Sequence, residues 1–170
     1  MRSLALALTL IISFVFAGCK KNKVLPTPTF EVVFKKDGTT EKFVPIYSTI
    51  QVNGTMPGMT DFMLVAKSRD NKDHFTITIQ VPGNFQAGTY TSGNANYTVI
   101  ADYFKNAGEA TERDYAIDHA PSMPNSSFQV NITGIDDQAI KGTFSSNYLY
   151  DRAYNESIEV NEGVFTIKRK

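Results

Sequence analysis

Thiol and imidazole side chains, which carry much of enzyme catalysis, are scarce in this chain of 170 residues. It has one cysteine, Cys19, and two histidines, His74 and His119. Neither histidine lies near a serine or cysteine motif, and the sequence lacks Gly-x-Ser-x-Gly, the motif that holds a serine nucleophile on a sharp turn. The residues therefore predict a non-enzymatic protein with no catalytic residues. A hydrolase with an unrecognised site is the remote alternative.

Metal-ligating patterns are weak as well. The sequence has no His-x-x-x-His pair, and zinc needs three or four nitrogen or sulfur ligands. The run from Asp70 to Asp73 offers oxygen donors but inserts Lys72, and it lacks the glycine and the terminal glutamate of an EF-hand loop. We interpret this run and Asp136-Asp137 as turns, and we predict neither a metal nor another cofactor.

Tyrosine side chains give a chemical signal in the second half of the chain. An exposed tyrosine beside asparagine or aspartate can stack on a sugar or anchor a protein partner. Tyr148 and Tyr150 are two residues apart and therefore share one face of a predicted strand, and Tyr103 and Tyr115 are further candidates. Tyrosines in strands also serve packing, so the sequence leaves recognition and packing open for all four.

The N-terminal segment has the character of a secretory signal peptide. Arg2 precedes residues 4–16, which are apolar except for Thr9 and Ser13. At 1.5 Å per residue a helix of that length reaches about 20 Å, short of the ~30 Å hydrocarbon core of a bilayer. A short apolar core behind one positive charge favours a cleaved signal over a membrane-spanning helix.

The end of this segment, Ala17-Gly18-Cys19, resembles the lipobox of bacterial lipoproteins, in which leucine, a small residue, and glycine or alanine precede the cysteine. The resemblance implies cleavage between Gly18 and Cys19 and a diacylglycerol on the Cys19 thiol. Phe16 stands where the pattern has leucine. The alternative is ordinary cleavage after Ala17, with Val15 as the second small residue. Two or three acyl chains form a stable anchor, since each buried CH₂ contributes about 0.8 kcal/mol.

The rest of the chain has the size of one domain, about 150 residues. Seventeen basic residues balance 17 acidic ones, so the charge does not favour nucleic acid as a partner. No cysteine follows Cys19, so the domain has to be stable without disulfides. Residues 19–29 are predicted to be a linker, which Pro26 and Pro28 favour in an extended form, and residues 30–170 the single domain.

Hydrophobic residues recur with a period of two through most of the domain, which predicts β-strands. Strands are expected over residues 30–34, 42–52, 62–68, 74–81, 88–91, 96–104, 127–135, 139–150 and 157–168. Pro45 predicts an edge strand or a bulged one, and Glu162-Gly163 predicts a bulge. Residues 105–124 are the least regular, with either a helical turn at 109–113 or a strand at 115–117.

About eight to ten short strands joined by Gly, Pro and Asn turns predict an all-β antiparallel fold. A β-sandwich and a closed lipocalin-like barrel both accommodate such strands. Pro45 and Pro57 suit sheet edges, which a barrel lacks, so the sequence favours the sandwich over the barrel.

The run Phe128–Phe144, which contains Ile140-Lys141-Gly142-Thr143-Phe144, resembles a hairpin near the C-termini of small all-β lipoproteins of the Bacteroidota type, and Phe165-Thr166-Ile167-Lys168 is similar too. The resemblance implies an outer-membrane lipoprotein of the bacterial cell envelope. In that group an acidic patch after the lipidated cysteine marks export to the cell surface. Lys20-Lys21-Asn22 departs from this pattern and favours the periplasmic side.

These observations predict a membrane-anchored β domain that binds a protein or glycan partner at the envelope. A small hydrophobic-ligand carrier is the alternative if the sheet closes into a barrel. The sequence leaves the oligomeric state open.

Overall fold

The computed structural model describes residues 29–117 and 126–169, which form ten antiparallel strands and confirm the predicted all-β class. The strands are β1 (Glu31–Lys36), β2 (Thr39–Val52), β3 (Met59–Ser68), β4 (His74–Pro82), β5 (Gly88–Thr91), β6 (Thr98–Lys105), β7 (Arg113–Ala116), β8 (Phe128–Ile135), β9 (Ala139–Asp151) and β10 (Glu156–Lys168). Of the predicted site residues, Gly18 and Cys19 lie outside the described ranges, as does His119.

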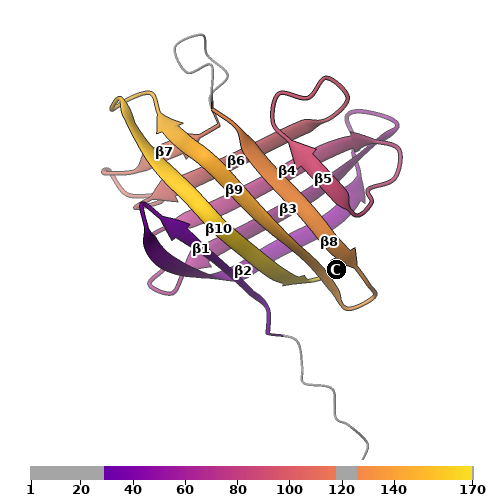
Figure 1. Ribbon diagram of the computed structural model, residues 1–170, viewed down its shortest axis with the longest axis horizontal. Coiled ribbons are helices and arrows are strands. Elements are labelled where there is room, and N and C mark those ends of the chain that lie inside the picture. The colour runs from indigo at the N-terminus through magenta and orange to yellow at the C-terminus, as the bar shows by residue number, and fades with distance from the viewer. Residues whose placement is uncertain (1–28, 118–125, 170) are drawn as a thin grey trace, which may run out of the picture.

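Eight strands close into an antiparallel barrel in the order β1-β2-β3-β4-β6-β7-β9-β10. The first strand closes the ring by pairing with the last, for example Glu31 with Thr166. Strands β8 and β5 extend the sheet from β9. Figure 1 shows β10, β9 and β8 crossing in front of β3, β4 and β6, so the barrel is flattened. The closed barrel, predicted as the alternative, is confirmed, and the preferred sandwich is wrong.

The sandwich prediction failed because Pro45 lies at a bulge within a closed sheet and not in the edge strand of an open one. The β1–β2 ladder ends at Phe43, whereas β2 continues to Val52, so β2 runs past its neighbour. The β2–β3 register shifts between Pro45 and Tyr47, which confirms the predicted bulge. Pro57 lies in the turn between β2 and β3. Both prolines therefore fit within a closed barrel.

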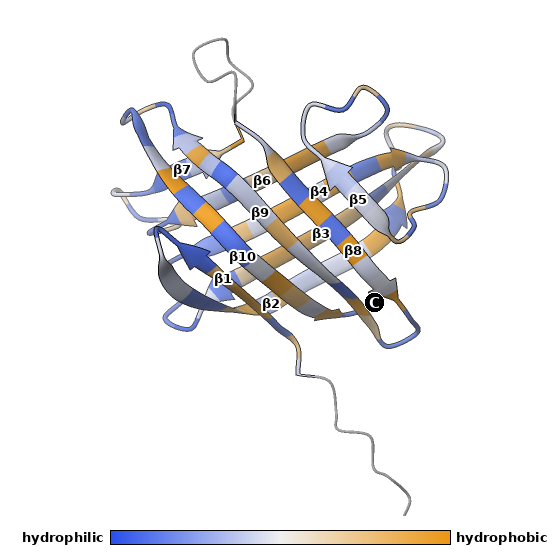
Figure 2. Ribbon diagram, in the orientation of Figure 1, coloured by the Kyte–Doolittle hydropathy of each residue, from blue (hydrophilic) through white to orange (hydrophobic). Residues whose placement is uncertain are grey.

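Aromatic rings fill the barrel interior. Hydrophobic and hydrophilic residues alternate along β8, β9 and β10, as the period of two predicted (Figure 2). The ring centroid of Phe75 on β4 lies 5.0 Å from that of Phe34 on β1 and 5.0 Å from that of Phe144 on β9. Phe62 on β3 lies 6.2 Å from Phe165 on β10. These ring contacts connect β3 and β4 with β1, β9 and β10 on the opposite side of the barrel, so side chains pack against one another across the interior.

Two glycines make room for two of these rings where β9 and β10 pair. Gly142 is the cross-strand partner of Phe165, and Gly163 is the partner of Phe144. A Cβ atom on Gly142 would lie 2.5 Å from the Phe165 ring, and one on Gly163 would lie 2.5 Å from the Phe144 ring. The register shift between Val160 and Gly163 confirms the predicted bulge. Each glycine thus lets the opposite ring lie flat over the backbone.

Four hairpin turns lie together at one end of the barrel, on the left of Figure 1, and we call this the hairpin end. They are residues 37–38, 69–73, 106–112 and 152–155. Backbone hydrogen bonds fix these turns: the Ala107 amide donates to the Lys72 carbonyl of the neighbouring turn over 2.7 Å, and the Asp37 amide donates to the Glu159 carbonyl of β10 over 3.1 Å. In the irregular segment the Glu112 amide donates to the Glu109 carbonyl over 3.0 Å, which makes one hydrogen-bonded turn, and strand β7 follows, as the strand alternative predicted.

Candidate functional site

Arg113, the first residue of β7, connects β7 to the β9–β10 hairpin at the hairpin end. Its Nε donates to Asp151 Oδ2 over 3.0 Å, and its second guanidinium nitrogen pairs with Glu156 Oε2 at 2.6 Å. The guanidinium carbon lies 3.4 Å from the centroid of the Tyr154 ring. The cation is therefore bound by two carboxylates and one aromatic face, all from the β9–β10 hairpin.

Asp151 is buried, with a side chain only 3% exposed. Besides Arg113, it accepts hydrogen bonds from the backbone amides of Ala153 at 2.9 Å and Tyr154 at 3.2 Å. A buried carboxylate is stable only when its charge and its lone pairs are satisfied. Asp151 therefore shapes the hairpin turn and fixes Arg113, and it offers no free carboxylate to a ligand.

Tyr103 is the predicted site residue that lies deepest, with a fully buried ring. Its hydroxyl donates to Asp73 and accepts a 3.1 Å hydrogen bond from Lys36 Nζ. Asp73 also accepts from the Asn106 amide over 3.1 Å, so this carboxylate links two hairpin turns. Burial, followed by the hydrogen bond to Asp73, raises the pKa of Tyr103, because both disfavour the phenolate. The ring belongs to the core, and only the hydroxyl reaches the hairpin end.

Tyr115 has a similar position next to Tyr103. Its ring is 4% exposed and meets the Tyr103 ring edge-on at 6.2 Å. The Tyr115 hydroxyl donates to Glu156 over 3.2 Å. Tyr103, Tyr115 and Glu156 line an open hollow of about 310 Å³ together with Lys36 and Lys105. This hollow presents phenol hydroxyls, lysine amines and a carboxylate, a mixture suited to polar contacts.

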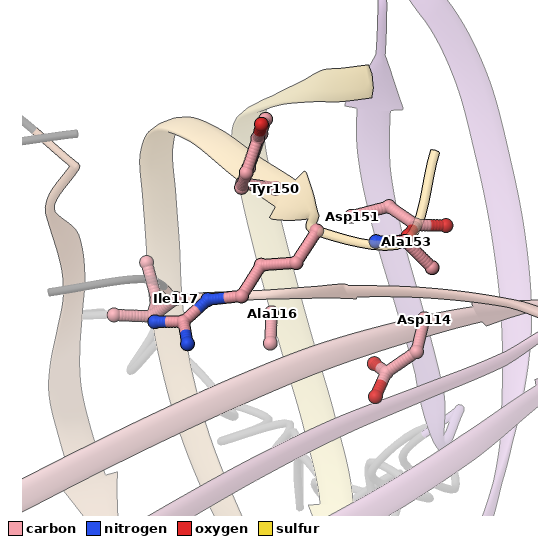
Figure 3. A pocket seen from close by; sticks show the side chains of 7 residues that line it. Asp114, Ala116, Ile117, Tyr150, Asp151 and Ala153 are labelled. Carbon is pink, nitrogen blue, oxygen red and sulfur yellow. The ribbon is translucent and has the colours of Figure 1, made fainter. Parts of the chain in front are cut away.

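A second hollow, of about 330 Å³, lies where β7 meets the end of β9. Figure 3 shows it lined by Asp114 and Ala116 on one strand and by Tyr150 and Asp151 on the other. Burial raises the pKa of Asp114, and the carboxylates of Asp102 and Asp151 contribute in the same direction. Since Asp151 is committed to Arg113, Asp114 is the carboxylate in the lining of this hollow that is available to a ligand.

The remaining predicted tyrosines lie on the outside of β9. Tyr148 and Tyr150 are half-buried and flank the inward-facing Leu149, so they share one face as predicted. The Tyr150 hydroxyl donates to Asn155 in the adjoining turn. Tyr154, 52% exposed, is the most accessible aromatic ring at this end, and the sequence analysis did not single it out. The accessible tyrosines are thus Tyr148, Tyr150 and Tyr154, whereas Tyr103 and Tyr115 contribute only their hydroxyls.

Sequence reasoning also missed Arg113, Lys36 and Asp73. Arg113 and Lys36 lie at strand ends beside hairpin turns and Asp73 is the last residue of a turn, which is the one signal that the sequence carries for them. Their partners lie 30 or more residues away, as in the Asp73–Tyr103 and Arg113–Asp151 pairs. Such distant pairs become visible only when the strand order is known.

In the described ranges, no cluster of three or more His, Cys, Asp or Glu residues is arranged to hold a metal ion. The same residues contain no helix that is both long and apolar enough to cross a bilayer. Comparison with protein-family models, with curated proteins and with solved structures finds no match to this chain.

Proposed function

We propose that this protein is a lipoprotein of the bacterial cell envelope whose β domain binds a protein or glycan partner through its hairpin end, without catalysis. Cys19 would carry the lipid and hold the domain on the periplasmic side of the outer membrane. The observation that carries this proposal is the direction of β1. Strand β1 runs from Glu31 to Lys36, so the segment that links Cys19 to the domain joins β1 at the end remote from the 37–38 turn.

The surface chemistry of the hairpin end supports a binding role. Tyr150 and Tyr154 present aromatic rings, and the two hollows beside them are lined by carboxylates, lysines and phenol hydroxyls. Aromatic side chains next to hydrogen-bonding groups are the usual anchors for protein partners and sugars. The Arg113 contacts hold the Tyr154 ring in place before a partner arrives, which lowers the entropy cost of binding.

The aromatic interior supports partner binding over the carrier alternative. A carrier for hydrophobic ligands needs enclosed apolar volume inside its barrel. Here Phe34, Phe75 and Phe144 meet at centroid distances of 5.0 to 5.8 Å across the middle of the barrel. The space that a ligand would occupy is taken by rings of the protein itself.

The anchor is tested by replacing Cys19 with alanine and fractionating the cells. We expect the wild-type protein in the membrane fraction, with the mass of an acylated cysteine at its N-terminus, and the variant outside that fraction. Unchanged membrane association of the variant, together with an unacylated wild-type mass, would refute the lipid anchor.

The binding role is tested with a photo-crosslinking residue placed at exposed Ala153 in the hairpin end, and with a matched control at exposed Gln138 in the β8–β9 turn. We expect a specific cross-linked protein, or retention on an envelope glycan, that requires the hairpin end and is lost on Tyr150→Ala. Equal capture from Ala153 and Gln138, with no glycan retention, would contradict the proposal.

A further inference from the structure

Exposed apolar side chains gather on β2 beside the first described residues. Val44, Ile46 and Tyr47 are 48%, 43% and 40% exposed. Phe30 lines a hollow of about 220 Å³ with Pro45, Ile46 and Tyr47. We call these five residues, Phe30 and Val44–Tyr47, the proximal patch.

The backbone explains why these side chains are exposed. The β1–β2 ladder ends at Phe43, so the next residues of β2 lie beyond the cover of β1. The register shift between Pro45 and Tyr47 makes Ile46 the extra residue of a bulge, outside the regular alternation. Neighbouring apolar side chains that the fold leaves in water mark a contact site more often than a scatter of single ones does.

Basic side chains surround the proximal patch. Lys42 and Arg69 line a second hollow beside Phe30, of about 130 Å³, and Lys168 lines the first. Glu31 is the acidic residue in these linings. An apolar centre with a cationic border matches an anionic lipid surface, in which acyl chains lie beneath negatively charged headgroups.

We propose that the proximal patch docks on the anionic surface of the membrane that holds Cys19. This inference rests on the proposed lipid anchor. Ten residues separate Cys19 from Phe30, and an extended chain of that length spans at most about 35 Å. The patch is therefore always within reach of the lipid, and its docking fixes the orientation of the domain relative to the membrane. The 69–73 turn, which begins at Arg69, then lies beside the membrane, whereas the 152–155 turn is available to a partner.

The test uses the full lipid-anchored chain, reconstituted in vesicles of phosphatidylglycerol and phosphatidylcholine that contain a nitroxide-labelled lipid. A fluorophore is attached to a cysteine introduced at Gln51, an exposed residue of β2 beyond the patch, or at Ala153 in the hairpin end as control. We expect strong quenching at Gln51 and weak quenching at Ala153. The double substitution Val44→Glu/Ile46→Glu should lower the docked-to-undocked ratio roughly tenfold, because it removes the apolar anchor and adds negative charge.

Vesicles of phosphatidylcholine alone should weaken the quenching at Gln51, since they lack the anionic headgroups. Unfolding midpoints of the double variant, measured beside the wild type, show whether its fold is retained; the single variants Val44→Ser and Ile46→Ser serve if it is not. Equal quenching at both labels, or quenching unaffected by these substitutions, would overturn the docking. So would a dimer that forms through the patch without lipid. Acyl mass on Cys19 is measured on the same sample, so failure of the anchor is distinguished from failure of the docking.

Discussion

Two junctions between barrel strands, the β9–β10 seam and the β7–β9 seam, are held together by different interactions. Strands β9 and β10 pair from Glu156–Asp151 to Lys168–Ala139, and their inner face carries the two glycine–phenylalanine pairs. Strand β7, in contrast, reaches β9 through a single backbone pair, Ala116 with Tyr150. The Arg113 contacts with Asp151 and Glu156 connect β7 to the β9–β10 hairpin where backbone pairing is short. The β9–β10 seam therefore depends on close packing of the apolar interior, whereas the β7–β9 seam depends on charged side chains.

The difference explains where a binding surface can form. In a long ladder the backbone N–H and C=O groups of the two strands pair with each other, so few of them remain for a binding partner. A short ladder held by side chains leaves space beside it, and the hollow lined by Asp114, Ala116 and Tyr150 lies at the β7–β9 seam. We therefore expect substitutions at the β9–β10 seam to affect stability most, and substitutions at the β7–β9 seam to cost less.

The largest effect is expected for Gly142→Ala at the β9–β10 seam. The added Cβ would lie 2.5 Å from the Phe165 ring and 2.6 Å from the backbone oxygen of Asn131, which cannot easily move. Overpacking of this kind costs about 3 kcal/mol of unfolding free energy, measured by urea denaturation. Gly134→Ala on β8 is the matched control, because nothing lies within 4 Å of its Cβ position. A similar loss for both alanines would show that packing against Phe165 is not the cause.

Arg113→Met should cost less, about 2 kcal/mol, because it leaves the buried Asp151 carboxylate without its cation while two backbone hydrogen bonds remain. Adding Asp151→Asn should recover part of that loss, since no buried charge is then left. Lys35→Met provides the comparison: the Lys35–Glu162 pair is 41% and 68% exposed and should contribute under about 0.5 kcal/mol. If the two single variants unfold at the same urea concentration, the β7–β9 seam does not depend on Arg113.

Tyr154→Ala should remove about 0.5–1 kcal/mol, the usual contribution of a partly exposed cation–π contact. Tyr154→Phe keeps the ring over Arg113 and should retain most of the stability. Thermal unfolding of both variants separates the ring from the hydroxyl. An equal loss in the phenylalanine and alanine variants would assign the contribution to the hydroxyl.

The smallest effect is expected at Asp102 on β6, the cross-strand neighbour of Ala116 on β7. Burial raises the pKa of Asp102 above its ordinary value of 3.8, although the Thr76 hydroxyl donates to its carboxylate over 3.0 Å. A carboxyl group whose pKa is raised by folding destabilises the protein once it ionises, so the penalty is absent in acid and complete at neutral pH. Asp102→Asn should therefore gain a few tenths of a kcal/mol near pH 7, and the gain should vanish below about pH 3.5. A gain that persists in acid would have another cause.

The strands could be predicted from the sequence because the alternation of Phe75, Ile77 and Ile79 is a local property of β4. Closure could not, because it depends on pairs such as Ala116–Tyr150, whose members lie far apart in the chain and carry no distinctive residue type. For the same reason, the sequence left packing and recognition open for the tyrosines. Val99, Ala101 and Tyr103 follow each other at a spacing of two along β6, which is the pattern of one inward face, and all three are buried.

The pairing of β1 with β10 also determines when the protein can finish folding. Contacts between residues as distant as Glu31 and Thr166 form slowly, because a long loop of chain has to close first. While the chain is synthesised from its N-terminus, one edge of β1 has no partner until residues 156–168 have emerged. An N-terminal fragment lacking β10 would expose that edge of β1 and one edge of β9 together, so it could not form the barrel. The barrel thus stays open until its last strand has been synthesised.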